Sequence, residues 1–156
     1  RLSGINPPNG TIRYKPQKIG QIILSAVIQS VYEMLGGDEP IRKMVDIFYD
    51  KVYQDPVLRP MFPDDMEESK RRQFLFLVQF FGGPRLYSQE RGHPRLRMRH
   101  FPFAIDRRAR DHWLRHMLEA IDEAGIDGLA RERMREYFDR SSAFLINRHD
   151  DIQPPK

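Results

Sequence analysis

The chain has 156 residues, 40% of them hydrophobic and 31% charged, a composition that predicts one globular domain and excludes an intrinsically disordered chain. It has no cysteine, which excludes a disulfide scaffold, a thiol nucleophile and a cysteine-ligated zinc or iron–sulfur centre. The formal net charge of +4 is local, because residues 85–115 hold nine arginines and three acidic residues and carry +6. Such a basic stretch suits nucleic acid, a membrane surface or an anionic small molecule.

The first 35 residues are predicted to form an extension and a helix. Residues 1–18 are rich in proline and contain Asn9-Gly10, which predicts a loose segment. An apolar run over residues 19–35 predicts a helix that ends at Gly36-Gly37. Three polar residues interrupt this run, so it is too short to span a membrane. We expect no membrane span, and the absence of cysteine fits a cytoplasmic protein.

Two further helices are predicted in the middle of the chain. The first opens at Pro40 and carries apolar residues at helical spacing, namely Ile41, Val45, Phe48, Tyr49 and Val52. Prolines at 56 and 60 break the chain, and the next helix runs over about residues 65–81 until Gly82-Gly83-Pro84. Its apolar face includes Gln73, and a buried amide without a partner costs a few kcal/mol. Gln73 therefore either bonds within the protein or faces a polar object in a pocket.

The second half of the chain is predicted to hold three helices. Residues 84–92 are expected to form a loop, and residues 94–100 a short helix that Pro102 stops. Asp106 can cap a long helix whose apolar positions are Ala109, Trp113, Met117, Ile121 and Ala124. Gly125 and Gly128 separate it from a last helix that ends near residue 145, and residues 148–156 are expected to fray. About six helices and no strand predict an all-α fold.

Two histidines on the long helix lie one turn apart. His112 and His116 could share a metal ion, but the metalloprotease pattern needs a glutamate directly after the first histidine, where this chain has Trp113. Both histidines flank the apolar line of the helix without lying on it. The sequence therefore favours two exposed histidines over a metal site.

His100 ends the short helix, and apolar residues surround it in the sequence. Leu96 lies one turn earlier, and Phe101-Pro102-Phe103 follow directly. Partial burial disfavours the charged imidazole, and the neutral imidazole is the form that binds metals. Three arginines lie within five residues of His100, which suits a nearby anionic group such as a carboxylate. His100 is thus either a hydrogen-bonded core histidine or a metal ligand.

Taken together, two runs of residues resemble the truncated haemoglobins. They are GGPRLY at 82–87 and GHPRLRMRHFPF at 92–103. The chain is most similar to group II of this family, which has a tryptophan in the helix after the proximal histidine, here Trp113. Phe48-Tyr49 and Phe62-Pro63 also fall in family-like places. The resemblance covers residues 31–147 and implies a truncated globin fold, a two-over-two helical sandwich around haem b. Residues 1–30 would be an N-terminal extension and residues 148–156 a frayed tail.

The resemblance implies a role for each matching residue. His100 would bind the haem iron, and Tyr49 would donate a hydrogen bond to bound dioxygen. Phe62 would pack on the distal side, where Ser69 and Gln73 occupy the two variable positions. Trp113 would be a further distal donor. The residues expected to line the haem or meet its propionates are Phe76, Leu77, Tyr87, Leu96, Arg97, Met98, Arg99, Phe103 and Met117.

The expected function is therefore a haem protein that binds dioxygen and other diatomic gases, including carbon monoxide and nitric oxide. The alternative is a haem enzyme for nitric oxide dioxygenation or peroxide reduction, which would need an external electron-donor reductase. A third interpretation takes the arginine-rich stretch as a nucleic-acid surface. It is disfavoured, because the exposed aromatics of single-strand binders and a helix-turn-helix are not evident. We expect a monomer or a homodimer without a nucleic-acid partner.

Overall fold

The computed structural model describes residues 29–149. This part of the chain contains seven α-helices, one 3-10 helix and no β-strand, so the all-α prediction is confirmed. The elements are α2 (Val31–Met34), α3 (Glu39–Gln54), the 3-10 helix η1 (Arg59–Met61), α4 (Glu67–Phe80), α5 (Leu86–Arg91), α6 (Leu96–His100), α7 (Arg107–Glu123) and α8 (Gly128–Phe144). None of these helices is long and apolar enough to span a membrane. The predictions for residues 1–28 and 150–156 lie outside the described residues.

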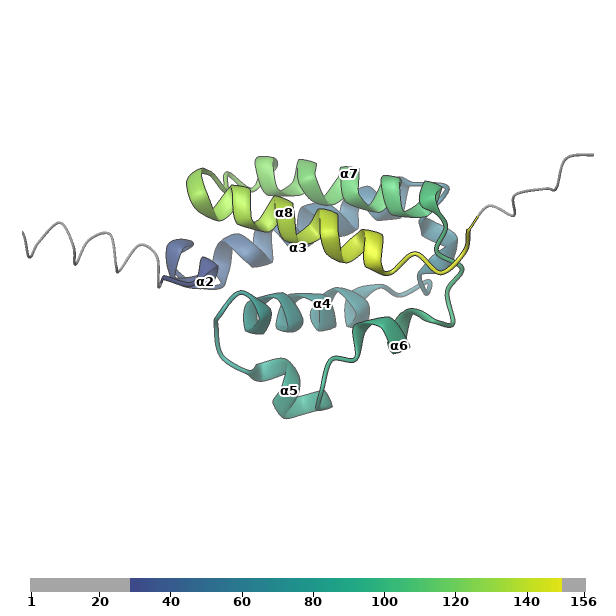
Figure 1. Ribbon diagram of the computed structural model, residues 1–156. Coiled ribbons are helices and arrows are strands. Elements are labelled where there is room, and N and C mark those ends of the chain that lie inside the picture. The colour runs from purple at the N-terminus through teal and green to yellow at the C-terminus, as the bar shows by residue number, and fades with distance from the viewer. Residues whose placement is uncertain (1–28, 150–156) are drawn as a thin grey trace, which may run out of the picture.

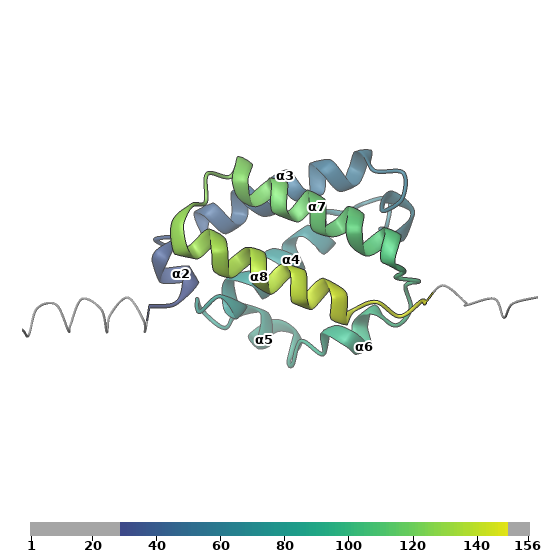
Figure 2. The same cartoon turned by 45° about the horizontal axis from the view of Figure 1, so that its top comes forward.

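Four long helices make the two-over-two sandwich that the resemblance implies. α3 packs against both α4 and α7, and α7 packs against α8. In Figure 1, α4 runs below α3, α7 and α8, with the short helices α5 and α6 beside it. The turned view separates α7 from α8 and shows that they run alongside each other (Figure 2). The helices α4, α5 and α6 therefore lie on one side of the molecule, and α3, α7 and α8 lie on the other.

The hydrophobic core lies where α3, α7 and α8 meet. The apolar spacing predicted for α3 is confirmed, because its inward-facing residues are almost fully buried. α7 and α8 each present a stripe of apolar residues to the same core. Among the most deeply buried members of this core are Ile41, Met44, Phe48, Val52, Met117, Ile121, Met134 and Phe138. This core fixes the positions of α3 and α7, which carry Tyr49 and Trp113.

Two glycines bring the end of α4 against α2, as the predicted helix stop at Gly82-Gly83 requires. Gly82 has a φ of +104°, and a Cβ built on it would lie 2.5 Å from the Cβ of Ser30. A Cβ on Gly83 would lie 2.8 Å from the ring of Tyr32. The backbone N–H of Tyr32 donates to the carbonyl of Phe81 across 2.9 Å. Only glycine fits this contact without a shift of the neighbouring residues.

Two expectations from the sequence are wrong. Residues 86–91 form α5 instead of a loop, because the side chain of Gln79 holds this segment on α4. Its Nε2 donates to Ser88 Oγ across 2.7 Å, and its Oε1 accepts the Ser88 N–H across 2.9 Å. The helix expected over residues 19–35 is not continuous, because Gln29 and Ser30 are not helical. Ser30 instead caps α2 in a capping box with Glu33.

Candidate functional site

His100 closes the short helix α6, and its imidazole is oriented from within that helix. Its Nδ1 lies 2.6 Å from the carbonyl oxygen of Leu96, one turn earlier. A carbonyl oxygen only accepts, so Nδ1 carries a proton, and in the neutral ring the lone pair then lies on Nε2. Within residues 29–149, no hydrogen bond uses Nε2. The half-buried imidazole is therefore oriented so that Nε2 is the nitrogen available to a metal.

The segment after His100 is held by Asn147, a residue that the sequence analysis did not single out. The side chain of Asn147 accepts the N–H of Ile105 across 2.9 Å. Its amide nitrogen donates to the carbonyl of Phe103 across 2.8 Å and to the carbonyl of His100 across 3.3 Å. These bonds tie the backbone around His100 to the segment that follows α8. No local pattern signals them, because the partners lie more than 40 residues apart.

Tyr49 lies on the inner face of α3 as a buried hydrogen-bond donor. Its side chain is 5% exposed, and its ring packs edge-on against Phe48 and Phe62 at 5.4 and 5.8 Å. Burial raises the pKa of Tyr49 well above its usual range, although the charge of Arg72 opposes this. The hydroxyl therefore stays protonated. None of the hydrogen bonds among the described residues gives it an acceptor.

Trp113 is a second donor beside the same aromatic ring. It comes from α7, is half-buried, and its ring packs against Phe48 at 5.3 Å and Phe138 at 5.8 Å. The indole N–H also has no acceptor among the hydrogen bonds of residues 29–149. Phe48 contacts both Tyr49 and Trp113, so the two donors flank a single core residue. Neither donor atom is among the buried polar atoms that lack a partner, so both reach accessible space, where they could donate to a ligand.

Phe62, Ser69 and Gln73 are half-buried around the start of α4. Phe62 is fixed by Arg59, whose Nη1 donates to the carbonyls of Phe62 and Pro63 across 3.2 and 3.1 Å. Within the described residues, no hydrogen bond engages the Gln73 amide, so the expectation that it bonds within the protein finds no support. Its amide remains available to a polar group outside the chain.

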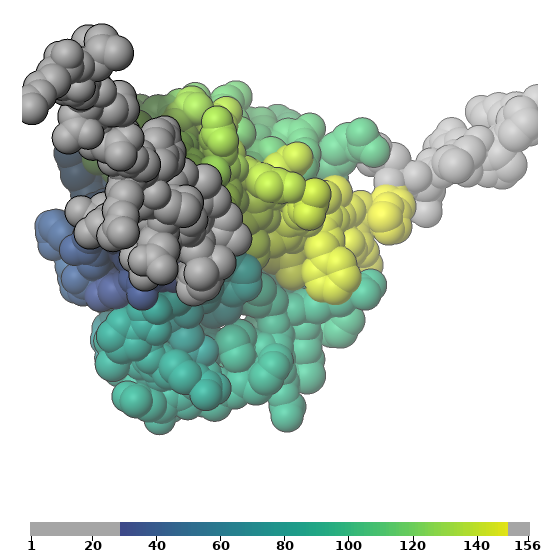
Figure 3. Space-filling view, turned by 60° about the vertical axis from the view of Figure 1, so that its left-hand side comes forward, coloured from purple at the N-terminus to yellow at the C-terminus, as the bar shows by residue number. Residues whose placement is uncertain are grey.

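Large apolar side chains are exposed on the segments around His100. They come from α4, α5, the α6 region and the end of α8, and they are Phe80, Leu86, Met98, Phe101, Phe103 and Phe144, each between 38% and 60% exposed. In the space-filling view a small gap is visible among the teal residues, below the yellow end of α8 (Figure 3). Exposed apolar side chains that lie together can mark ligand or partner sites. The donor set and this apolar surface fit a flat, apolar group bound through His100.

The remaining predicted contacts differ in their surroundings. Leu77, Tyr87 and Met117 are buried in the protein, Phe76 and Leu96 are half-buried, and Met98, Phe103, Arg97 and Arg99 are exposed. The guanidinium of Arg97 lies 5.1 Å from the ring centre of Phe144. Arg99 donates from Nε to the carbonyl of Pro94 across 2.8 Å, and this hydrogen bond links α6 to the loop before it.

Comparisons with known proteins place this chain among globins. Residues 30–147 match the family model described as bacterial-like globin. The chain is 41% identical over 116 residues to group 2 truncated hemoglobin YjbI of Bacillus subtilis, covering 74% of this chain and 87% of that protein. A hemoglobin structure from the thermophilic phototrophic bacterium Chloroflexus aurantiacus shares 53% identity with a TM-score of 0.76, over 77% of this chain and 99% of that one. The structure of a truncated oxygen-avid haemoglobin from B. subtilis shares 40% identity with a TM-score of 0.73, over 76% and 100%.

Proposed function

Because the chain belongs to the bacterial-like globin family and, within it, to the group II truncated haemoglobins, we propose that it binds haem b through His100 and takes up dioxygen reversibly. Haem binding follows from the family. The iron ligand, the distal donors and the preference for dioxygen are the proposal. The observation that carries it is the His100 imidazole, whose Nδ1 is committed to Leu96 and whose Nε2 is free.

The role of His100 follows from its hydrogen bond. A metal-binding histidine is commonly oriented by a bond from its other ring nitrogen, which also raises its basicity. The carbonyl of Leu96 supplies that bond here, at 2.6 Å. Asn147 restrains the backbone carbonyls of His100 and Phe103, so the ring has little freedom to turn away. His100 is therefore prepared to bind iron through Nε2.

Haem, when bound, supplies a ferrous iron that accepts a diatomic gas such as dioxygen, carbon monoxide or nitric oxide. Tyr49 would donate a hydrogen bond toward such a gas from its O–H, and Trp113 from its indole N–H. Burial keeps the Tyr49 proton in place at any ordinary pH. Dioxygen gains partial negative charge in such a site, so donors in a low-dielectric pocket strengthen its binding. Gln73 is the third donor, through its amide nitrogen.

Apolar side chains and an arginine would contact the macrocycle and the propionates of the haem. Phe76, Leu96, Met98 and Phe103 are exposed or half-exposed apolar side chains that a macrocycle would cover. Arg97 has no carboxylate partner among the described residues, and it is the better candidate for a propionate than Arg99. Tyr87 packs its ring on Phe76 at 5.7 Å and supports that wall.

The B. subtilis structure is described as oxygen-avid, and the resemblance of the two chains supports tight dioxygen binding here. The test is a dioxygen binding equilibrium on the protein reconstituted with haem b, followed by stopped-flow dissociation of dioxygen and carbon monoxide. We expect one haem per chain and a reversible complex that releases dioxygen slowly. Failure to hold haem, or immediate oxidation without a reversible complex, would contradict the proposal.

A further inference from the structure

A cluster of one carboxylate and two imidazoles joins the C-terminal end of α3 to the middle of α7. Asp55 Oδ2 lies 2.8 Å from Nδ1 of His112 and 2.5 Å from Nε2 of His116. Asp55 is 5% exposed, and both histidines are half-buried. The expectation of two exposed histidines is therefore wrong, because Asp55 comes from another helix to meet them. One ligand atom from each of the three residues lies within 4.8 Å of the others.

Asp55 has outer partners of the kind that orient a metal ligand. Oδ1 of Asp55 accepts the backbone N–H groups of Val57 and Leu58 across 2.7 and 3.1 Å, which leaves Oδ2 for a cation. Burial alone would raise the pKa of Asp55. Its hydrogen bonds from the two histidines and the backbone outweigh that effect and hold the pKa well below its usual range. The carboxylate is therefore ionised at any ordinary pH.

The second nitrogen of His116 is an unexplained buried polar atom. Its Nδ1 has no hydrogen-bond partner in the described structure, and Glu119 Oε2 lies 3.9 Å away. Glu119 is held by Lys51, whose Nζ lies 3.1 Å from it. A cation on Nε2 would move the ring proton to Nδ1, and that proton would point toward Glu119. Ligating histidines commonly make this bond to a carboxylate.

We propose that Asp55, His112 and His116 form a binding site for a divalent zinc-class cation, separate from the haem site. The ligands are Oδ2 of Asp55, Nδ1 of His112 and Nε2 of His116. Two imidazoles and one carboxylate are ligands that Zn²⁺ takes, with water in the fourth position. When both rings are neutral, each ring proton moves to the other ring nitrogen through solvent. Binding then releases no net proton.

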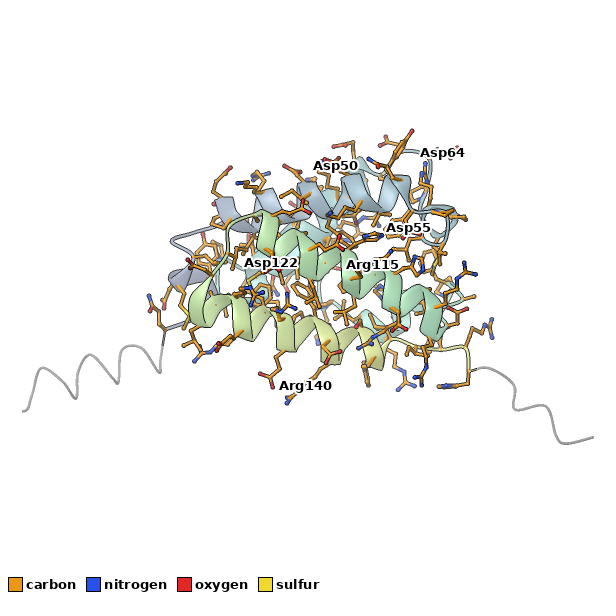
Figure 4. The ribbon with its side chains drawn as sticks, turned by 90° about the horizontal axis from the view of Figure 1, so that it is seen from above. Asp50, Asp55, Asp64, Arg115, Asp122 and Arg140 are labelled. Carbon is orange, nitrogen blue, oxygen red and sulfur yellow. The ribbon has the colours of Figure 1, made fainter. Side chains whose placement is uncertain are left out.

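The present spacing is that of hydrogen bonds, and it must widen slightly. Tetrahedral Zn²⁺ holds its ligands at about 2.0–2.2 Å, which places them about 3.3 Å apart. Each contact to Oδ2 must therefore open by less than about 1 Å, a side-chain adjustment. Among the described residues, Arg115 is the only lysine or arginine within 4.0 Å of Asp55, at 3.9 Å from Oδ2. Its side chain is 56% exposed and can swing away. Figure 4 shows Asp55 and Arg115 beside each other, seen from above.

Access to the cluster comes from the surface of α7. A hollow in that surface is lined by His112 and Arg115, next to Asp111. His112 is the more exposed imidazole, with 26% of its side chain accessible against 12% for His116. Of the three proposed ligands, His112 lines this hollow. A bound cation would cross-link the C-terminal end of α3 to α7. One of its ligands, His112, directly precedes Trp113.

The test is calorimetric titration of ZnCl₂ into the purified haem-containing protein, expressed without a histidine tag, in a non-coordinating buffer. The variants His112→Gln and His116→Gln each remove one ligand and keep a polar side chain. His93→Gln is the matched control, because His93 is exposed and belongs to neither site. Glu119→Gln probes the outer partner, and thermal unfolding with and without Zn²⁺ provides a second readout.

We expect one Zn²⁺ per chain in the wild-type protein and in His93→Gln, with a raised unfolding temperature. Each ligand variant should lose at least tenfold in affinity and lose the thermal shift, and Glu119→Gln should weaken binding roughly tenfold to a hundredfold. If both ligand variants unfold prematurely, the Glu119→Gln result still decides the matter. Absence of binding to the wild type, or wild-type affinity in His112→Gln or Glu119→Gln, would overturn the proposal.

Discussion

Asn147 donates from its side chain to the carbonyl oxygen of His100, across 3.3 Å of space and 47 residues of sequence. The same side chain bonds Phe103 and Ile105, so three backbone groups at and after the end of α6 depend on one amide. α6 has only five residues, and Arg95 directly before it is the one non-glycine residue with a positive φ in the described structure. Such a helix has little stability of its own. The position of His100 therefore depends on Asn147, in the segment that follows α8.

Asn147→Ala should loosen His100 without touching the haem. Each lost hydrogen bond contributes about 1 kcal/mol, and partly exposed groups recover some of it in water, so we expect a loss of about 1–3 kcal/mol in unfolding free energy. Haem should also transfer faster to an acceptor apoglobin. Asn147→Asp is the matched control, because it keeps the acceptor for Ile105 and removes the donors to His100 and Phe103. Unchanged haem transfer in both variants would rule out this positioning role.

Trp113→Phe should release dioxygen faster. A hydrogen bond to a partly charged acceptor contributes about 1.5–3 kcal/mol, and each 1.4 kcal/mol is a factor of ten. We therefore expect the dioxygen dissociation rate to rise roughly ten- to a hundredfold in stopped-flow measurements. Carbon monoxide carries less negative charge in such a site, so its release should change less.

Tyr49→Phe should act in the same direction, and the double variant should be less than additive because both donors address one ligand. Equal acceleration of both gases in Trp113→Phe would mean that the pocket has merely loosened. Trp113 would then be a packing residue between Phe48 and Phe138.

Gly82 and Gly125 differ in what an added side chain would meet. Gly125 has a φ of +79° and open space around its Cβ position, so Gly125→Ala meets backbone strain alone, about 1–2 kcal/mol. Gly82 has a φ of +104° and a Cβ position only 2.5 Å from Ser30 Cβ, so Gly82→Ala meets strain and collision together. Denaturant unfolding should show the larger loss for Gly82→Ala. Equal losses would indicate that Ser30 moves aside freely.

Tyr137 predicts how stability changes at alkaline pH. Burial raises the pKa of Tyr137 to about 12, although a hydrogen bond from Ser141 lowers it in part. A raised pKa contributes stability that is complete below the unfolded value of about 10 and is lost as the pH rises toward 12. The wild type should therefore lose on the order of 1 kcal/mol relative to Tyr137→Phe between pH 10 and 11. Parallel unfolding curves for the two proteins across that range would disprove the shift.

Local patterns predicted most of the helices, because each depends on signals close together in the chain. The apolar stripe of α3, the glycine stop after α4 and the Asp106 cap of α7, whose side chain accepts the Ala109 N–H at 2.7 Å, are such signals. α5 was missed because its six residues lie between Pro84 and Gly92, and only the contact of Gln79 with Ser88 reveals why they are helical.

Local patterns alone predicted less of the candidate site than of the fold. The resemblance to truncated haemoglobins supplied the roles of His100, Tyr49 and Trp113, since spacing alone left each of them a plausible core residue. Asn147 and the meeting of Asp55 with His116 depend on contacts across 42 to 61 residues. A tertiary contact of this kind leaves no periodic trace in a single sequence, so only the folded structure reveals it.

The most direct test of the central claim is the absorption spectrum of the ferrous, ligand-free protein, compared with that of His100→Ala. The hydroxyl of Ser69 is a poor iron ligand, so the wild type should give a five-coordinate, histidine-ligated spectrum at neutral pH. His100→Ala should lose most of its haem or lose that histidine-ligated spectrum. If His100→Ala keeps the same five-coordinate, histidine-ligated spectrum, His100 is not the iron ligand and the proposed site is wrong.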